Sequence, residues 1–281
     1  MRSCQLLGVP FQPGPEAVGV VRDMAYGDDA AHRLDLYRVS SRDPTPVIVY
    51  VHGGGWQRGD KAMTRVVGRK AQHWLARGWA VAVINYRLFP ETDVLGQAED
   101  VGRSLAFLQR EASVHNLDRG RIALVGHSAG AHLVALLAAN PQRMRTMQPD
   151  PWQSTVIIDT AMLDVPGVMR RPHFGFYDPV FGSDPDYWRA ASPLHAMQRA
   201  PATPILIVVS ARRADSRRAA EAFARRAVEL GGRVCVLPVR LGHAALNQAL
   251  GSDPVYTAAV DRFLQNPERQ AAAGVGILED S

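Results

Sequence analysis

The first candidate for a reactive side chain is the serine of the pentapeptide Gly126-His127-Ser128-Ala129-Gly130. This pentapeptide follows the apolar run 121–125, which indicates a buried strand. It precedes the segment 131–139, which consists almost entirely of strong helix formers. A serine between two glycines at such a strand-to-helix turn sits in a strained backbone conformation with its hydroxyl above the sheet. We therefore predict that Ser128 is a nucleophile.

A second motif, His52-Gly53-Gly54-Gly55-Trp56, follows another apolar strand at 47–51. Glycines in such a turn lack a Cβ, so the main chain can approach a substrate closely. An alkoxide that develops on a carbonyl oxygen needs backbone N–H donors aimed at it. We predict these donors at Gly54, Gly55 and Ala129, the residue after the nucleophile. The alternative for the glycines is a tight turn without a binding role.

Three side chains of these motifs have secondary roles in this interpretation. His52 is expected to be structural and to hydrogen-bond its own loop. Trp56 and His127 are candidates for the wall of a substrate pocket, although Trp56 could equally pack in the core.

A serine nucleophile needs a histidine that takes its proton and an acid that orients the histidine. His243 follows the strand expected at 233–239, where a late-strand loop usually supplies the base. Its alternative is a surface loop histidine. His132 lies on the helix after Ser128 and is expected to be structural. His173 and His195 are weaker candidates for the base, because they lie in the expected cap region between the strands at 155–158 and 205–209.

The acid is expected between the serine and the histidine in chain order, after the strand at 205–209. Asp215 is the carboxylate between that strand and the helix expected at 216–230. Asp215 could instead cap this helix or form ion pairs with the arginines beside it. Asp159 and Asp164 stay open as alternative acids.

Hydrophobic periodicity predicts strands that alternate with helices after an initial antiparallel hairpin. This order predicts an α/β class fold, with a mostly parallel sheet covered by helices on both faces. We expect one domain, with its core at 16–265, a cap or insertion at 162–201 and a flexible tail at 266–281. The predicted strands are 18–26, 32–39, 46–51, 79–86, 121–125, 155–158, 205–209 and 233–239, and the predicted helices are 61–77, 99–111, 131–139, 216–230 and 253–264.

The 281 residues suffice for a sizeable core, and the net charge of +5 comes mainly from arginine. The densest basic patch, at 212–226, shows no alternation of basic and aromatic residues and no nucleic-acid-binding motif, so we expect a solvated helix face and no nucleic-acid partner. No apolar stretch is long enough for a membrane span. The N-terminus lacks a secretory signal pattern, so we expect a cytoplasmic protein, or one trimmed before residue 1. The two cysteines predict no disulfide framework, and Cys235 is expected to be a buried thiol.

These motifs resemble the α/β-hydrolase fold esterases, in the branch of hormone-sensitive lipase, the small bacterial carboxylesterases and kynurenine formamidase. The similarity covers most of the chain between Arg22 and Leu264. It is carried by His52 to Trp56, Asn85 to Leu88, Gly126 to Gly130, Tyr187 to Leu194, and Gly242-His243 followed by Leu246-Asn247.

The resemblance implies a serine carboxylesterase without metal or cofactor, with Ser128, Asp215 and His243 as its triad. The leading hypothesis is hydrolysis of short to medium, uncharged acyl esters, and kcat/KM should rise with pH through roughly 6 to 7.5 because a histidine base must be neutral. The acid loop departs from the family pattern, because it opens with Ser210 instead of glycine. Gly55 stands where formamidases often carry an aromatic residue, which favours an esterase. An arylformamidase and a ligand-binding scaffold without catalysis are the alternatives, and the natural substrate and oligomeric state stay open.

Overall fold

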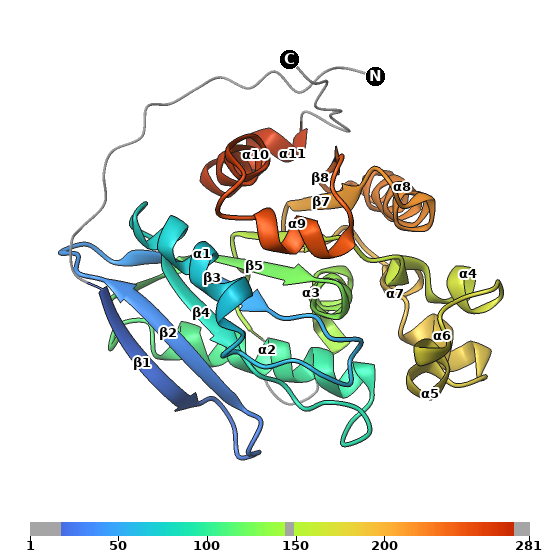
Figure 1. Cartoon of the computed structure of the whole chain (residues 1–281), viewed down its shortest axis with the longest axis horizontal. Helices are drawn as coiled ribbons and strands as arrows, with labels where there is room; N and C mark the ends of the chain where they lie inside the picture. Colours follow the sequence, from blue (N-terminus) through green and yellow to red (C-terminus); the bar gives the residue numbers. More distant parts are fainter. Residues whose placement is uncertain (1–17, 144–148, 273–281) are drawn as a thin grey trace.

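The computed structural model describes residues 18–143 and 149–272, and an eight-stranded sheet lies at its centre (Figure 1). The strand order is β1-β2-β4-β3-β5-β6-β7-β8. The β1–β2 and β2–β4 pairs are antiparallel, and every other neighbouring pair is parallel. The strands are β1 (Val18–Ala25), β2 (Arg33–Val39), β3 (Thr45–Val51), β4 (Ala80–Ile84), β5 (Leu117–His127), β6 (Ser154–Ile158), β7 (Ile205–Ser210) and β8 (Val234–Val239).

Helices cover both faces of this sheet, because its central strands are apolar on both sides. Side chains of α1 (Thr64–Leu75), α9 (His243–Ala249), α10 (Pro254–Gln265) and α11 (Pro267–Ala272) pack in one core. Side chains of α2 (Val94–Arg110), α3 (Ala129–Ala139) and α8 (Ala214–Glu229) pack in the other. Two faces covered in this way explain why β3, β4 and β6 are buried along their whole length. The predicted α/β class and the initial hairpin are therefore confirmed.

Two features differ from the prediction. His243 is the first residue of a short helix, α9, rather than part of a loop. Part of the expected flexible tail, 267–272, forms α11, and Ala271 is buried in the core, so that prediction is wrong for this stretch. The apolar face that carries Ala271 is too short to show a clear helical period in the sequence. The rest of the tail and the N-terminal lead-in lie outside the described residues.

The expected insertion at 162–201 consists of short helical segments beside the main sheet (Figure 1). Four of them carry proline at the first or second helical position, where its fixed φ suits the first turn and its missing backbone N–H leaves no helical hydrogen bond unmade. They are η2 (Met162–Asp164), α4 (Val165–Met169), η3 (Gly175–Tyr177), α5 (Asp178–Phe181), α6 (Pro185–Ala190) and α7 (Pro193–Ala196), and a further 3₁₀ turn, η1 (Pro141–Arg143), follows α3.

The parallel strands bring the ends of distant segments to one edge of the sheet. In the register of β5 and β6, His127 is paired with Ile158. The next residue on each strand is Ser128 on one and Asp159 on the other. Ligand and catalytic groups in open α/β sheets lie at this carboxyl edge.

Candidate active site

Ser128 occupies a strained turn between β5 and α3. Its φ is 57° and its ψ is −117°, a conformation that residues with a side chain seldom adopt. Gly126 and Gly130 make the turn possible, because a Cβ on Gly126 would overlap the Gly130 carbonyl and one on Gly130 would overlap that of Val51. The backbone N–H of Ser128 donates to the Ile158 carbonyl at 3.0 Å, which ties the turn to β6. The predicted strand–turn–helix geometry is confirmed.

His243 lies against Ser128, as the sequence predicted. Its Nε2 is 3.0 Å from the Ser128 Oγ, and its Nδ1 is 2.6 Å from the Asp159 Oδ2. A neutral imidazole with its proton on Nδ1 donates to Asp159 and accepts from the serine hydroxyl. This tautomer is the one a general base needs.

The buried carboxylate beside the histidine belongs to Asp159, which follows β6 directly. Its side chain is 0% exposed, and Oδ1 accepts a hydrogen bond from the Ser210 backbone N–H at 3.0 Å. Burial alone would raise the pKa of Asp159, but the hydrogen bonds from His243 and Ser210 and the Arg213 guanidinium outweigh it and lower that pKa to about 2. Asp159 is therefore an anion at neutral pH.

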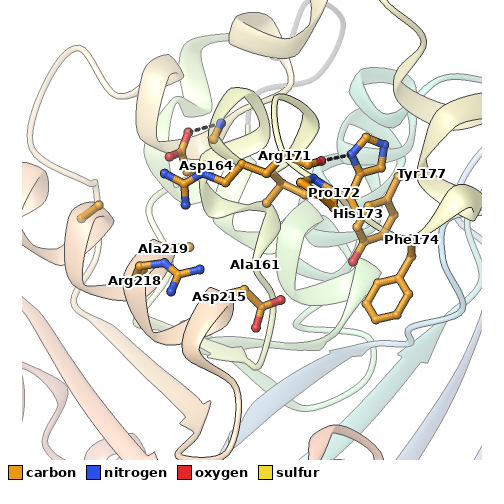
Figure 2. Close-up of a pocket in the computed structure, with 13 residues that line it drawn as sticks. Ala161, Asp164, Arg171, Pro172, His173, Phe174, Tyr177, Asp215, Arg218 and Ala219 are labelled. Atoms are coloured by element: carbon orange, nitrogen blue, oxygen red, sulfur yellow. Dashed lines mark hydrogen bonds between the residues drawn. The ribbon is translucent and has the colours of Figure 1, made fainter.

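Asp215, the predicted acid, does not reach His243, so the structure corrects that assignment. Its carboxylate accepts from the Arg213 Nη2 at 2.9 Å, and its side chain is 43% exposed. Figure 2 shows Asp215 with Arg218 in a neighbouring cavity of about 640 Å³. Asp215 is kept from His243 by its local surroundings. It lies in the first turn of α8, and Arg213 binds its carboxylate.

One feature of the sequence points to Asp159 as the acid, although it does not by itself distinguish Asp159 from Asp215. Asp159 is the first residue after the apolar strand β6, just as Ser128 is the first residue after β5. Equal placement at the carboxyl ends of neighbouring parallel strands brings two side chains together. The two side chains meet because β5 and β6 are neighbours in the sheet, and the sequence does not give this pairing.

The glycine turn lies at the mouth of the same site. Gly54 has a φ of 136° and Gly55 one of 62°, and a Cβ on Gly54 would collide with the Arg58 carbonyl. The N–H groups of Gly54 and Gly55 donate to no residue that the structure describes, and the two glycines line one cavity with Ser128. Ala129 is the first residue of α3, where the backbone N–H has no partner within the helix. Within residues 18–143 and 149–272, no atom accepts a hydrogen bond from the N–H groups of Gly54, Gly55 or Ala129, the three predicted oxyanion donors.

Two cavities of about 460 Å³ each meet at Ser128 and His243. One extends past the glycine turn and is lined by His127. The other extends toward the insertion and is lined by Trp56, with Phe174, Phe176 and Tyr177. Both predicted pocket residues thus lie at the site, on different sides of the serine.

Four further histidines considered in the sequence analysis have side-chain contacts that do not involve Ser128. The His52 Nδ1–H donates to the Gly53 carbonyl at 2.9 Å, as expected for a loop-stabilising residue. His132 is fully buried, accepts from the Trp56 indole at 3.1 Å and donates to the Ala191 carbonyl at 2.7 Å. Burial lowers the pKa of His132 to about 4, so it is neutral. His173 contacts Asp178 and His195 contacts Ser192, and neither lies at the serine.

His127 holds His243 in place through the main chain. Its Nε2–H donates to the His243 carbonyl at 3.0 Å, and the two ring centroids are 4.6 Å apart. Burial and the nearby His243 lower the pKa of His127 to about 3, so this ring stays neutral.

Within residues 18–143 and 149–272, no three His, Cys, Asp or Glu side chains gather in a group that could bind a metal ion. In the same part of the chain, no helix has the length and apolar character needed to cross a bilayer.

The mostly parallel sheet, the serine at its strained turn and the late-strand histidine define an α/β-hydrolase fold protein. A family model described as BD-FAE matches residues 34–164. The solved structure of esterase B from Lactobacillus Rhamnosis superimposes with a TM-score of 0.74 at 19% identity, covering 92% of this chain and 88% of the other. A thermophilic esterase of Thermogutta terrifontis gives 0.70 at 22% identity, covering 89% and 93%.

Sequence relatives are similar over a shorter stretch. The isoprenylcysteine alpha-carbonyl methylesterase ICME of Arabidopsis thaliana is 38% identical over 117 residues, which cover 41% of this chain and 27% of the relative. Esterase LipC of Mycobacterium tuberculosis is 34% identical over 141 residues, or 48% and 34% of the two chains. Kynurenine formamidase of Danio rerio is 31% identical over 129 residues, or 45% and 41%. The matches thus span less than half of each of these relatives, and they confirm the resemblance to this esterase branch.

Proposed function

We propose that this protein is a serine hydrolase of carboxylic esters, with Ser128 as nucleophile, His243 as base and Asp159 as the orienting acid. The observation that carries the proposal is the unbroken contact chain from the Ser128 Oγ through His243 to Asp159, with distances of 3.0 and 2.6 Å. The esterase relatives and structural neighbours support it.

The geometry supports an acyl-enzyme mechanism. The Ser128 Oγ attacks the ester carbonyl carbon while its proton passes to the His243 Nε2. The carbonyl oxygen becomes an alkoxide, which accepts hydrogen bonds from the N–H groups of Gly54, Gly55 and Ala129. The tetrahedral intermediate then collapses, the ester C–O bond breaks, and the departing alkoxide takes the proton from His243. Water attacks the acyl group by the same steps in reverse, which releases the acid and restores Ser128.

The two cavities suit short to medium acyl and alcohol groups on either side of the serine. Each holds about 460 Å³, and their walls combine aromatic rings with few charged groups. We infer a small, uncharged ester substrate, and we retain a cytoplasmic location as part of this proposal.

The test is hydrolysis of p-nitrophenyl esters, from acetate to decanoate, by the wild type and by Ser128→Ala. We expect turnover with a preference for short chains, and a loss of at least about 10³-fold in kcat for the variant. kcat/KM should rise between roughly pH 6 and 7.5, since only a neutral histidine accepts the proton. An equal rate in the variant would exclude Ser128 as nucleophile.

A second candidate is hydrolysis of an aryl formamide, which the similarity to kynurenine formamidase favours. The same triad would attack the formyl carbon and release an aniline. Parallel assays with a p-nitrophenyl ester and N-formylated anilines decide between the two by their kcat/KM values. Absence of turnover on both would favour a binding scaffold without catalysis.

A further inference from the structure

Arg213 places a guanidinium in direct contact with the acid of the triad. Its Nη1 donates to the Asp159 Oδ2 at 2.9 Å, and its Nη2 donates to the Asp215 Oδ2 at the same distance. Asp159 is 0% exposed, whereas the Arg213 side chain is 21% exposed. Arg213 therefore links a buried carboxylate to one at the edge of the neighbouring cavity.

The same Nη1 lies 3.0 Å from the His243 Nδ1. Arginine only donates hydrogen bonds, and Nδ1 already uses its proton for Asp159. The contact between Arg213 and His243 is therefore the approach of a fixed cation to a ring that becomes a cation during catalysis. Like charges this close disfavour the protonated ring.

The charged and titratable groups around His243 come from four elements. Asp159 follows β6, and Arg213 precedes α8. His127 at the end of β5 is neutral, because burial and the nearby His243 lower its pKa to about 3. On α1, the buried Lys70 Nζ donates to the Asn247 carbonyl of the helix that carries His243, and burial lowers the pKa of Lys70 to about 7.

The side of Arg213 that faces the insertion has two neighbours of its own. The Tyr177 phenol, from η3, interacts with Arg213, and its pKa is raised by burial. The Asp215 carboxylate is the anion on this side, and its side chain is 43% exposed.

We propose that Arg213 and Asp215 form a charge pair that sets the pH at which the Ser128–His243 pair becomes active. Arg213 is a positioning residue that acts through Asp159 and His243, and Asp215 reduces the effect of its charge. The inference rests on the proposed ester hydrolysis. It gives Asp215 an indirect role, two contacts away from the base.

Two substitutions on this pair predict shifts of opposite sign. In Arg213→Gln the repelling cation is gone, so the protonated ring is favoured and the pH midpoint of kcat/KM should rise by about 0.5 to 1 unit. In Asp215→Asn the cation loses its partner, so the midpoint should fall by about half a unit. Arg213→Lys keeps the charge and should stay near the wild-type midpoint, with a lower plateau because lysine cannot bridge both carboxylates.

The opposite signs of the two midpoint shifts distinguish an effect of the Arg213 charge from a purely structural role of Arg213. If Arg213 only held Asp159 in position, the variants would lower kcat on the plateau and leave the midpoint unchanged. That result, or shifts of the same sign in Arg213→Gln and Asp215→Asn, overturns the proposal. Should Arg213→Gln fail to fold, Asp215→Asn still tests the sign.

A second readout does not depend on turnover. The Cε1–H resonance of His243, identified by its loss in His243→Gln, can be followed by NMR from pH 4 to 9 in each protein. The midpoints should shift in the same directions as those of kcat/KM. If no ester or formamide is hydrolysed but these shifts appear, the proposed function fails and the charge pair stands. If esters are hydrolysed and the resonance does not shift, the charge pair fails alone.

Discussion

Asp159 shows how a single buried carboxylate becomes the partner of the proposed catalytic histidine. It has a φ of 49°, a conformation that aspartate tolerates better than most residues. Three donors, from Ser210, Arg213 and His243, converge on its two oxygens. These donors outweigh the cost of burial and keep the charge that an imidazolium needs beside it.

The roles of the candidate acids can be separated by kinetics. We expect Asp159→Asn to lower kcat/KM about 10³- to 10⁴-fold on the high-pH plateau, because the ring loses its orientation and its charge partner. In Asp215→Asn, kcat/KM on this plateau should stay within about tenfold of the wild-type value. The Asp215 carboxylate contacts Arg213 and does not contact Ser128 or His243. Asp164→Asn is a control, because that carboxylate caps α4 through the Gly167 N–H. A large loss in Asp215→Asn with an active Asp159→Asn would reverse the assignment.

At the scale of elements, the base depends on how helix α9 is fixed to the sheet. The Tyr50 hydroxyl, on β3, donates to the Asn247 Oδ1 at 2.6 Å. The Lys70 ammonium, on α1, donates to the Asn247 carbonyl. The Ser210 hydroxyl, on β7, donates to the Leu241 carbonyl at 2.6 Å just before α9. Contacts to three elements hold the start and the end of this short helix, so His243 keeps its place.

Lys70 should make the stability of this region depend on pH. Burial lowers its pKa from 10.5 to about 7. Between pH 7 and about 10.4 the unfolded chain binds the proton that the folded chain has released, so stability rises with pH. Lys70→Met should remove this rise, which urea unfolding at pH 7 and pH 10 would measure.

The other lysine of the chain supplies the control for this experiment. Burial opposes protonation of Lys61, but its bonds to Asp23 and Asp35 outweigh burial and raise its pKa. The contribution of a lysine with a raised pKa is present below its unfolded pKa and lost only as pH rises through the folded pKa. Lys61→Met should therefore keep the rise between pH 7 and 10. The same rise in wild type and Lys70→Met would contradict the assignment to Lys70.

At the scale of the whole molecule, the site is assembled from three parts of the chain. The sheet edge supplies the proposed triad, the turn after β3 supplies the glycines, and the insertion supplies aromatic walls. Phe176 from the insertion and Gly55 from the turn line both cavities beside Ser128. Phe176 is 45% exposed and is not part of a core. Its position suits a partition between the two cavities.

Removal of this partition should change the acyl chain preference. In Phe176→Ala the two cavities would join, and we expect the best p-nitrophenyl ester to become longer, with a several-fold higher KM for acetate because contacts are lost. Phe174→Ala is the matched control, since Phe174 lines only one of the two cavities beside the serine. Identical chain-length profiles for Phe176→Ala and the wild type would show that Phe176 does not divide the site.

Features that depend on a local pattern follow from the sequence alone. The apolar strand, the glycine-flanked turn and the helix formers predict the position of Ser128, because backbone strain and helix propensity act over a few neighbouring residues. The same holds for the glycine turn and for His243 after β8, although the onset of α9 at His243 was missed.

The choice of the carboxylate beside His243 follows from the tertiary structure. Asp159 and Asp215 both follow strands, and both stand between the serine and the histidine in chain order. The pairing of β5 with β6 brings Asp159 to the serine, while Arg213 comes between Asp215 and the ring. Strand order and the competition of one arginine for two carboxylates are contacts between distant parts of the chain, and no local pattern encodes them.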